Sequence, residues 1–124
     1  MPRVRTRIAI LGCLFGLGLL AIPAIAVEPR IVATPSVVHR GGSVRVHGTI
    51  IGCAIGDTVT LISRAFSHRH EFAGVPAVFA TVGPNHAYSV RARIPATRRP
   101  GRYSITGRCG GGNLGVEAPL RVLR

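Results

Sequence analysis

The sequence contains no lysine and no tryptophan, and it has only four carboxylate side chains against 16 arginines. Without a lysine, the glycines at 110–112 cannot form a Walker-type phosphate loop, and no helical pattern follows them. The carboxylates Glu28, Asp57, Glu71 and Glu117 are scattered along the chain and do not suggest paired acids for glycoside hydrolysis. No serine lies in a nucleophile-elbow sequence. We therefore expect that the protein is not an enzyme.

An uncharged apolar run follows a basic start. Residues 3, 5 and 7 are arginines, and no charged residue occurs at positions 8–27. Pro23 interrupts the run just before the small-x-small triplet Ala24-Ile25-Ala26, and this order of features is typical of a secretory signal peptide. We therefore predict a signal peptide at residues 1–26, cleavage after Ala26, and an exported domain at residues 27–124.

Two other interpretations of this segment stay open. Twenty uncharged residues are long enough to span a bilayer as an uncleaved anchor, although Pro23 favours cleavage. A lipoprotein interpretation of Cys13 is weaker, because the apolar core follows that cysteine instead of preceding it. All three interpretations place the rest of the chain outside the cell, so we expect a secreted or envelope-associated protein. Membrane attachment is expected only if the segment is not cleaved.

Two of the three cysteines, Cys53 and Cys109, lie in the predicted exported domain. An even pair of cysteines in an oxidising compartment predicts a disulfide. The domain of 98 residues carries 13 arginines and four carboxylates, a net charge of +9, and it is only just large enough for one core. A disulfide between these cysteines closes the loop of residues 53–109, and in the chain-entropy model a loop of this length stabilises the fold by about 4 kcal/mol.

Alternation of apolar and polar residues recurs through residues 27–124, whereas no segment keeps a helical period. Seven short strands are predicted at residues 31–38, 44–50, 58–61, 78–82, 88–94, 103–109 and 114–122, with a long connection at 64–75. This spacing predicts an all-β, antiparallel sandwich of two sheets. The predicted disulfide would link the second and sixth strands across the sandwich, near one end.

Several short motifs resemble those of a known family. They are TPSVV at 34–38, GGSV at 41–44, GC at 52–53, GDTVTL at 56–61, IP at 94–95 and PGRYSI at 100–105, followed by Cys109. The chain thus resembles bacterial immunoglobulin-like domains of secreted proteins from high-GC Gram-positive bacteria. The resemblance implies an immunoglobulin-like sandwich, a fold that such proteins use as spacer, adhesive or binding module.

Two related families fit less well. The first motifs are also similar to small antibiotic-carrying chromoproteins related to neocarzinostatin, but those usually have two disulfides and only one is possible here. Antibody-type domains are excluded, because tryptophan is absent and Tyr103 lies six residues before Cys109 instead of two.

Arginines on the predicted strands are the main candidate site. In an immunoglobulin-like order the second and fifth strands pair, which would place Arg45 and His47 on one outer face with Arg91 and Arg93. Loop arginines would extend this face, namely Arg98, Arg99 and Arg102. Guanidinium groups in such a patch bind phosphate, sulfate or carboxylate groups. The candidate anion-binding residues are therefore Arg45, Arg91, Arg93 and Arg99. The competing interpretation is that arginine reflects GC-rich coding and solubility.

Expected partners are anionic envelope polymers or another envelope protein. Nucleic acid is not expected, because aromatic residues do not interleave with the arginines. A weaker candidate for metal binding is the cluster His68, His70 and Glu71, but it lacks a recognised ligand motif, so no metal or other cofactor is predicted.

The sequence as a whole predicts a non-catalytic binding or adhesion module. The alternative is a small-ligand carrier with a cleft between the sheets or under the 64–75 loop. Phe66, Phe72 and Phe79 would line that cleft, unless they simply pack in the core.

Overall fold

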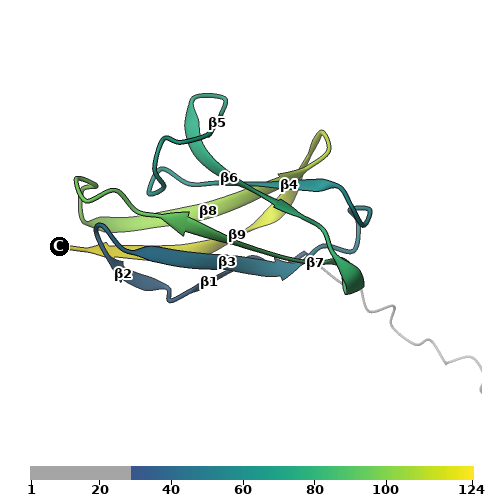
Figure 1. Ribbon diagram of the computed structural model, residues 1–124, viewed down its shortest axis with the longest axis horizontal. Coiled ribbons are helices and arrows are strands. Elements are labelled where there is room, and N and C mark those ends of the chain that lie inside the picture. The colour runs from purple at the N-terminus through teal and green to yellow at the C-terminus, as the bar shows by residue number, and fades with distance from the viewer. Residues whose placement is uncertain (1–28) are drawn as a thin grey trace, which may run out of the picture.

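The computed structural model describes residues 29–124, so the predicted signal peptide and its cleavage after Ala26 lie outside the described residues. The described part is all-β, as predicted, and contains nine strands and one short 3-10 helix (Figure 1). The strands are β1 (Val32–Thr34), β2 (Val37–His39), β3 (Ser43–Thr49), β4 (Thr58–Ile62), β5 (Glu71–Phe72), β6 (Val75–Thr81), β7 (Ala87–Arg93), β8 (Gly101–Cys109) and β9 (Gly112–Leu123). Within residues 29–124, no helix has the length and apolar character needed to cross a membrane.

The strands form two sheets. The smaller has the order β1-β3-β7, and the larger has the order β2-β9-β8-β4-β6-β5. The predicted first strand is divided at Pro35, so that β1 pairs with β3 in one sheet and β2 pairs with β9 in the other. Because β2 runs beside β9 in the same direction, this pair is parallel, and the prediction of purely antiparallel pairing is wrong at this edge.

Alternation along the strands produces the core. Every residue that the alternation assigns to an inner face between β3 and β9 is buried or packs against the buried cluster, for example Val46, Leu61, Ile105 and Leu120. Both sheets contribute to this single cluster, so their inner faces pack together, as in a two-sheet sandwich. The predicted long connection also contributes, because the side chain of Phe66 is fully buried.

The first described residues dock on the end of β3. The backbone N–H of Arg30 donates to Thr49, and its carbonyl accepts a hydrogen bond of 2.8 Å from the Tyr88 hydroxyl. Gly48 permits this approach, since a Cβ at position 48 would lie 1.9 Å from the Arg30 carbonyl oxygen. The C-terminus lies at the opposite end of the domain, where Leu123 pairs with His39 (Figure 1).

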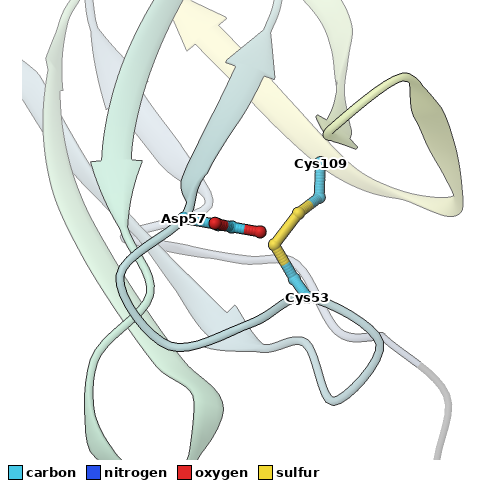
Figure 2. A group of neighbouring side chains, drawn as sticks. All are labelled: Cys53, Asp57 and Cys109. Carbon is cyan, nitrogen blue, oxygen red and sulfur yellow. A yellow bond between two sulfur atoms is a disulfide. The ribbon is translucent and has the colours of Figure 1, made fainter.

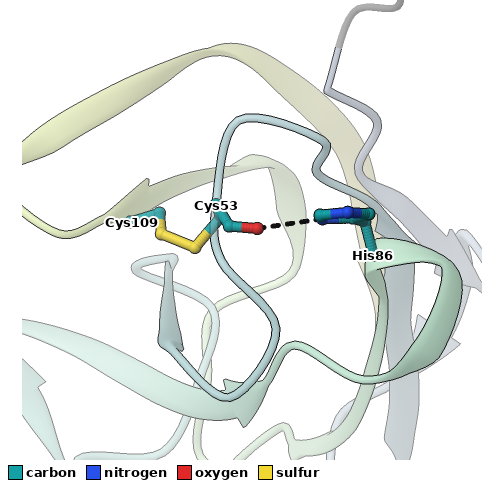
Figure 3. The surroundings of a disulfide bond; sticks show 3 residues. All are labelled: Cys53, His86 and Cys109. Carbon is teal, nitrogen blue, oxygen red and sulfur yellow. Dashed lines mark hydrogen bonds between the residues drawn. A yellow bond between two sulfur atoms is a disulfide. The ribbon is translucent and has the colours of Figure 1, made fainter.

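The predicted disulfide between Cys53 and Cys109 is confirmed, with the two Cα atoms 6.2 Å apart. It links the segment after β3 to the end of β8, and thus joins the two sheets near the end where Arg30 docks. The exposed carboxylate of Asp57 points toward the two sulfur atoms (Figure 2). The imidazole Nδ1 of His86 donates to the Cys53 carbonyl oxygen at 3.0 Å and so holds this loop in place (Figure 3).

Candidate anion-binding site

Strand register brings three of the predicted arginines onto one surface. On the paired strands β3 and β7, Arg45 lies opposite Arg91 and Ser43 lies opposite Arg93. The intervening residues Val44 and Ala92 are buried, so the arginines point outward, and all three are exposed. We call this surface the three-strand face, defined by Ser43, Arg45, Ser89, Arg91 and Arg93.

Serine hydroxyl groups orient two of these guanidinium groups. Arg45 Nη1 donates to Ser89 Oγ at 2.8 Å, and Arg91 Nε donates to Ser43 Oγ at 2.9 Å. Each bond joins β3 to β7 and uses one of the five N–H donors of its guanidinium, so several donors stay directed to solvent. The face therefore presents fixed positive charge with free hydrogen-bond donors.

A groove of about 500 Å³ lies at one end of the three-strand face. Its lining residues are Gly41, Gly42, Ser43, Arg69, Arg91 and Arg93. Arg69 comes from the irregular 64–75 segment, which is tied to the end of β7 by a backbone hydrogen bond of 3.0 Å from Ser67 to Arg93. Sequence reasoning missed Arg69 as a member of this site, because no strand period connects it with β7.

Carboxylates do not neutralise this charge. Among residues 29–124, no arginine has a carboxylate oxygen within 4.0 Å, and the basic side chain that does contact a carboxylate is His68, which binds Glu71 at 2.9 Å. Asp57 lies beside the disulfide, and Glu117 lies on β9 in the other sheet. The guanidinium groups are thus available to an external anion.

Arg99, also predicted for this site, is not among the residues that line its groove. It is exposed in the loop between β7 and β8, where its backbone carbonyl accepts a hydrogen bond from the Tyr103 hydroxyl. Arg98 is partly buried and donates from Nη2 to the Phe66 carbonyl at 2.9 Å. Arg102 lies on β8, in the six-stranded sheet, so it does not extend the three-strand face.

The weaker metal candidate does not have the expected geometry. His68 lies in a turn and binds Glu71 at 2.9 Å, whereas the ring of His70 packs against Phe79 with centroids 5.4 Å apart. Their imidazoles thus have different neighbours. In the described part of the chain, the ligand atoms that converge belong to Cys53, Asp57 and Cys109, but the two sulfurs are bonded to each other.

The three phenylalanines do not line one cleft. Phe66 is buried in the core, whereas Phe72 and Phe79 remain 38% and 43% exposed on β5 and β6. The Arg108 guanidinium lies over the Phe72 ring, 5.2 Å from its centroid, so one arginine does contact an exposed aromatic ring. The predicted lining of a carrier cleft by all three rings is therefore wrong, because Phe66 is enclosed in the core whereas Phe72 and Phe79 are exposed to solvent.

No protein-family model and no curated protein sequence matches this chain. A solved structure with a similar fold is the alkylpurine DNA glycosylase AlkC of Pseudomonas fluorescens bound to DNA containing an abasic site analog. It matches 78% of this chain at 17% identity with a TM-score of 0.51. The match spans 30% of the glycosylase chain, so the likeness concerns the fold of that part alone.

Proposed function

We propose that residues 27–124 form an exported immunoglobulin-like domain that acts as a non-catalytic binding or adhesion module at the cell envelope. Its three-strand face binds the phosphate, sulfate or carboxylate groups of anionic polymers. The observation that carries this proposal is the set of three exposed arginines on that face, two of them held by serines and none with a carboxylate oxygen within 4.0 Å among the described residues.

Strand order supports the immunoglobulin-like assignment. In that fold strands A, B and E belong to one sheet and strands C, F and G to the other. If β1 and β2 count as one interrupted first strand and the two-residue β5 is left out of the count, the small sheet holds the first, second and fifth strands. The large sheet holds the third, sixth and seventh; the fourth strand, β6, lies beside β4 in this sheet, whereas the constant-type order places strand D with A, B and E. The Cys53–Cys109 disulfide, which joins the two sheets, fits an oxidising extracellular compartment.

The chemistry of the face favours polymers with repeated anionic groups. Planar guanidinium groups bind phosphate and carboxylate oxygens in pairs, and several such contacts along a chain add to each other. Envelope polymers with phosphodiester or acidic sugar groups have this chemistry. DNA has it too, and the structural neighbour named above is a DNA-bound enzyme, so DNA belongs among the probes.

Sedimentation of the exported protein with envelopes of its own organism tests this proposal. The three-strand variant, Arg91→Ser with Arg93→Ser, removes two charges from the face. A charge-matched control, Arg30→Ser with Arg108→Ser, removes two charges near the disulfide end of the domain. We expect saturable binding that the three-strand variant weakens by on the order of tenfold or more, because each charge-assisted hydrogen bond contributes more than 1 kcal/mol.

The control separates a site from general charge. Binding that weakens equally in both variants and disappears at moderate salt would mean that the arginines act only through net charge, and would overturn the proposal. DNA at the same phosphate concentration distinguishes an envelope polymer from a nucleic-acid ligand. Stronger retention by DNA than by envelopes would move the function to DNA binding.

A further inference from the structure

We infer that the six-stranded sheet carries a second anion-binding surface, so that one domain bridges two anionic chains. This inference rests on the proposed function of the three-strand face but uses different residues. Arg102 on β8 lies directly opposite Arg121 on β9. Both are exposed, whereas Leu120 and Val122 on either side of Arg121 are buried and Ile105, of the opposite parity on β8, is buried too, so both arginines project from the outer face of the sheet.

Three adjoining grooves continue from this arginine pair. The first, of about 260 Å³, contains Arg102 and Arg121. The second, of about 480 Å³, shares Arg102 and Tyr103 with the first and extends to Arg64. The third, of about 280 Å³, shares Arg64 with the second and reaches Arg98. We call this line of grooves the six-strand furrow, defined by Arg64, Arg98, Arg102 and Arg121.

No carboxylate lines the furrow. None of its four arginines has a carboxylate oxygen within 4.0 Å in residues 29–124. Two acids lie at its borders: Glu117 is opposite Thr106 of the second groove, and Glu71 binds His68 of the third groove at 2.9 Å. The guanidinium of Arg98 donates from Nη2 to the Phe66 carbonyl, whereas its buried Nε has no hydrogen-bond partner. A nearby anion would stabilise that charge.

The shape of the furrow indicates the class of ligand. A small anion would need one enclosed pocket, whereas here guanidinium groups recur at successive junctions of open grooves. Such spacing fits a linear chain with an anionic group in each repeat. Tyr103 also lines two of the grooves, and it packs against the core cluster beneath them.

The arginine pairs of the two sheets point in opposite directions. The inner faces of the sheets share one core, so Arg91 lies on one outer face of the sandwich and the Arg102–Arg121 pair on the other. The two surfaces approach each other at the 64–75 segment, where Arg69 lines the groove of the three-strand face and His68 lines the third groove of the furrow. A polymer held on one surface thus leaves the other surface open for a second chain.

Light scattering with linear inorganic polyphosphate of uniform length tests bridging. A six-strand variant, Arg102→Ser with Arg121→Ser, is compared with wild type, the three-strand variant and the charge-matched control. Wild type and control should form large complexes at intermediate ratios of protein to polymer, and these should disperse when either component is in excess. The three-strand and six-strand variants should each still bind the polymer, with an affinity on the order of tenfold below that of the wild type. Neither should form large complexes.

The outcomes separate the two proposals. If the six-strand variant scatters like wild type, the furrow is not a site and the proposed three-strand face stands. If only the six-strand variant loses binding, the furrow stands and the three-strand face is wrong. Complexes of one protein with one polymer at every ratio would mean that a single chain wraps both surfaces, which overturns bridging. Absence of binding by wild type would overturn both. Urea midpoints no lower than that of the wild type exclude misfolding of the variants as the cause.

Discussion

Arg45 and Arg91 lie directly opposite each other on β3 and β7, and each guanidinium is held by a serine hydroxyl on the other strand instead of by a carboxylate. Like charges at directly opposite strand positions destabilise a sheet. A second pair of directly opposite arginines lies on the other sheet, where Arg102 is opposite Arg121. A bound polyanion would replace this repulsion with attraction, so the two pairs link ligand binding to the stability of the fold.

Removing one member of the first pair should stabilise the free protein while it weakens ligand binding. We expect Arg91→Thr to raise the free energy of unfolding by about 0.2–1 kcal/mol at low salt, because the cross-strand repulsion disappears. The gain should shrink at high salt, which screens exposed charges. Urea unfolding at two salt concentrations measures this effect. Arg108→Thr is the control, since Arg108 lies opposite Asn113, and an equal salt-dependent gain there would contradict a pairwise effect.

Strand alternation in the sequence was sufficient to predict which arginines project outward. The buried residues Val44, Val46 and Ala92 set the parity of β3 and β7, so Arg45 and Arg91 must lie on the outer face. The disulfide was also predictable, because the predicted compartment and the number of cysteines leave one pairing in the predicted domain at residues 27–124.

Irregular segments were not predictable in the same way. Arg69 and Phe66 belong to the 64–75 connection, where no period relates sequence position to a face. Their places depend on long-range contacts, such as the hydrogen bond between Ser67 and Arg93. The division of the first strand at Pro35 likewise depends on two different partner strands, β3 and β9, which a local pattern does not contain.

Gly48 should be essential for the docking of the Arg30 backbone on the end of β3. A Cβ at this position would meet the Arg30 carbonyl oxygen at 1.9 Å, so Gly48→Ala must displace this backbone. We expect a loss of about 1–3 kcal/mol in the free energy of unfolding, as for other overpacked sites. Gly52→Ala is the matched control, because a Cβ there has no heavy atom within 4 Å. Urea unfolding compares them, and equal midpoints would contradict the close approach.

Tyr88 should make stability depend on alkaline pH. Burial raises the pKa of its phenol above the ordinary value, and its hydroxyl donates to the Arg30 carbonyl. In the unfolded chain a tyrosine ionises near pH ~10. The folded protein therefore keeps a proton that the unfolded chain releases, and its stability falls as the pH rises above that value.

Comparison with Tyr88→Phe isolates this contribution. Near neutral pH the wild type should be more stable by about 1 kcal/mol, the usual contribution of one hydrogen bond. This difference should shrink from pH ~10 upward, because only the wild type carries the ionisable group at this position. Urea unfolding of both proteins over that range gives the difference. A difference that stays constant with pH would contradict a raised pKa in the folded state.

The disulfide should account for a large part of the net stability. Cys53 and Cys109 are 56 positions apart, and a loop of this length corresponds to about 4 kcal/mol in the chain-entropy model. Cys53→Ala with Cys109→Ala should therefore lower the free energy of unfolding by roughly that amount. Reducing agent should lower the stability of the wild type to a similar level and leave the double variant unchanged. The double variant has no disulfide to reduce, so its destabilisation by the reducing agent would mean that the agent does not act through the disulfide, and would contradict this prediction.

The mass of the exported protein tests the predicted N-terminus and the oxidation state together. Cleavage after Ala26 gives a chain that starts at Val27, and the disulfide makes it two hydrogens lighter than its reduced form. Intact mass spectrometry of protein from the medium and from washed membranes, before and after reduction, resolves both features. A full-length chain recovered only with membranes would overturn cleavage and favour the anchored alternative. In that form the domain would stay tethered through its N-terminal end, where Arg30 docks. Arg121 and the Gly41–Gly42 side of the groove on the three-strand face lie toward the opposite end and would point away from the membrane anchor.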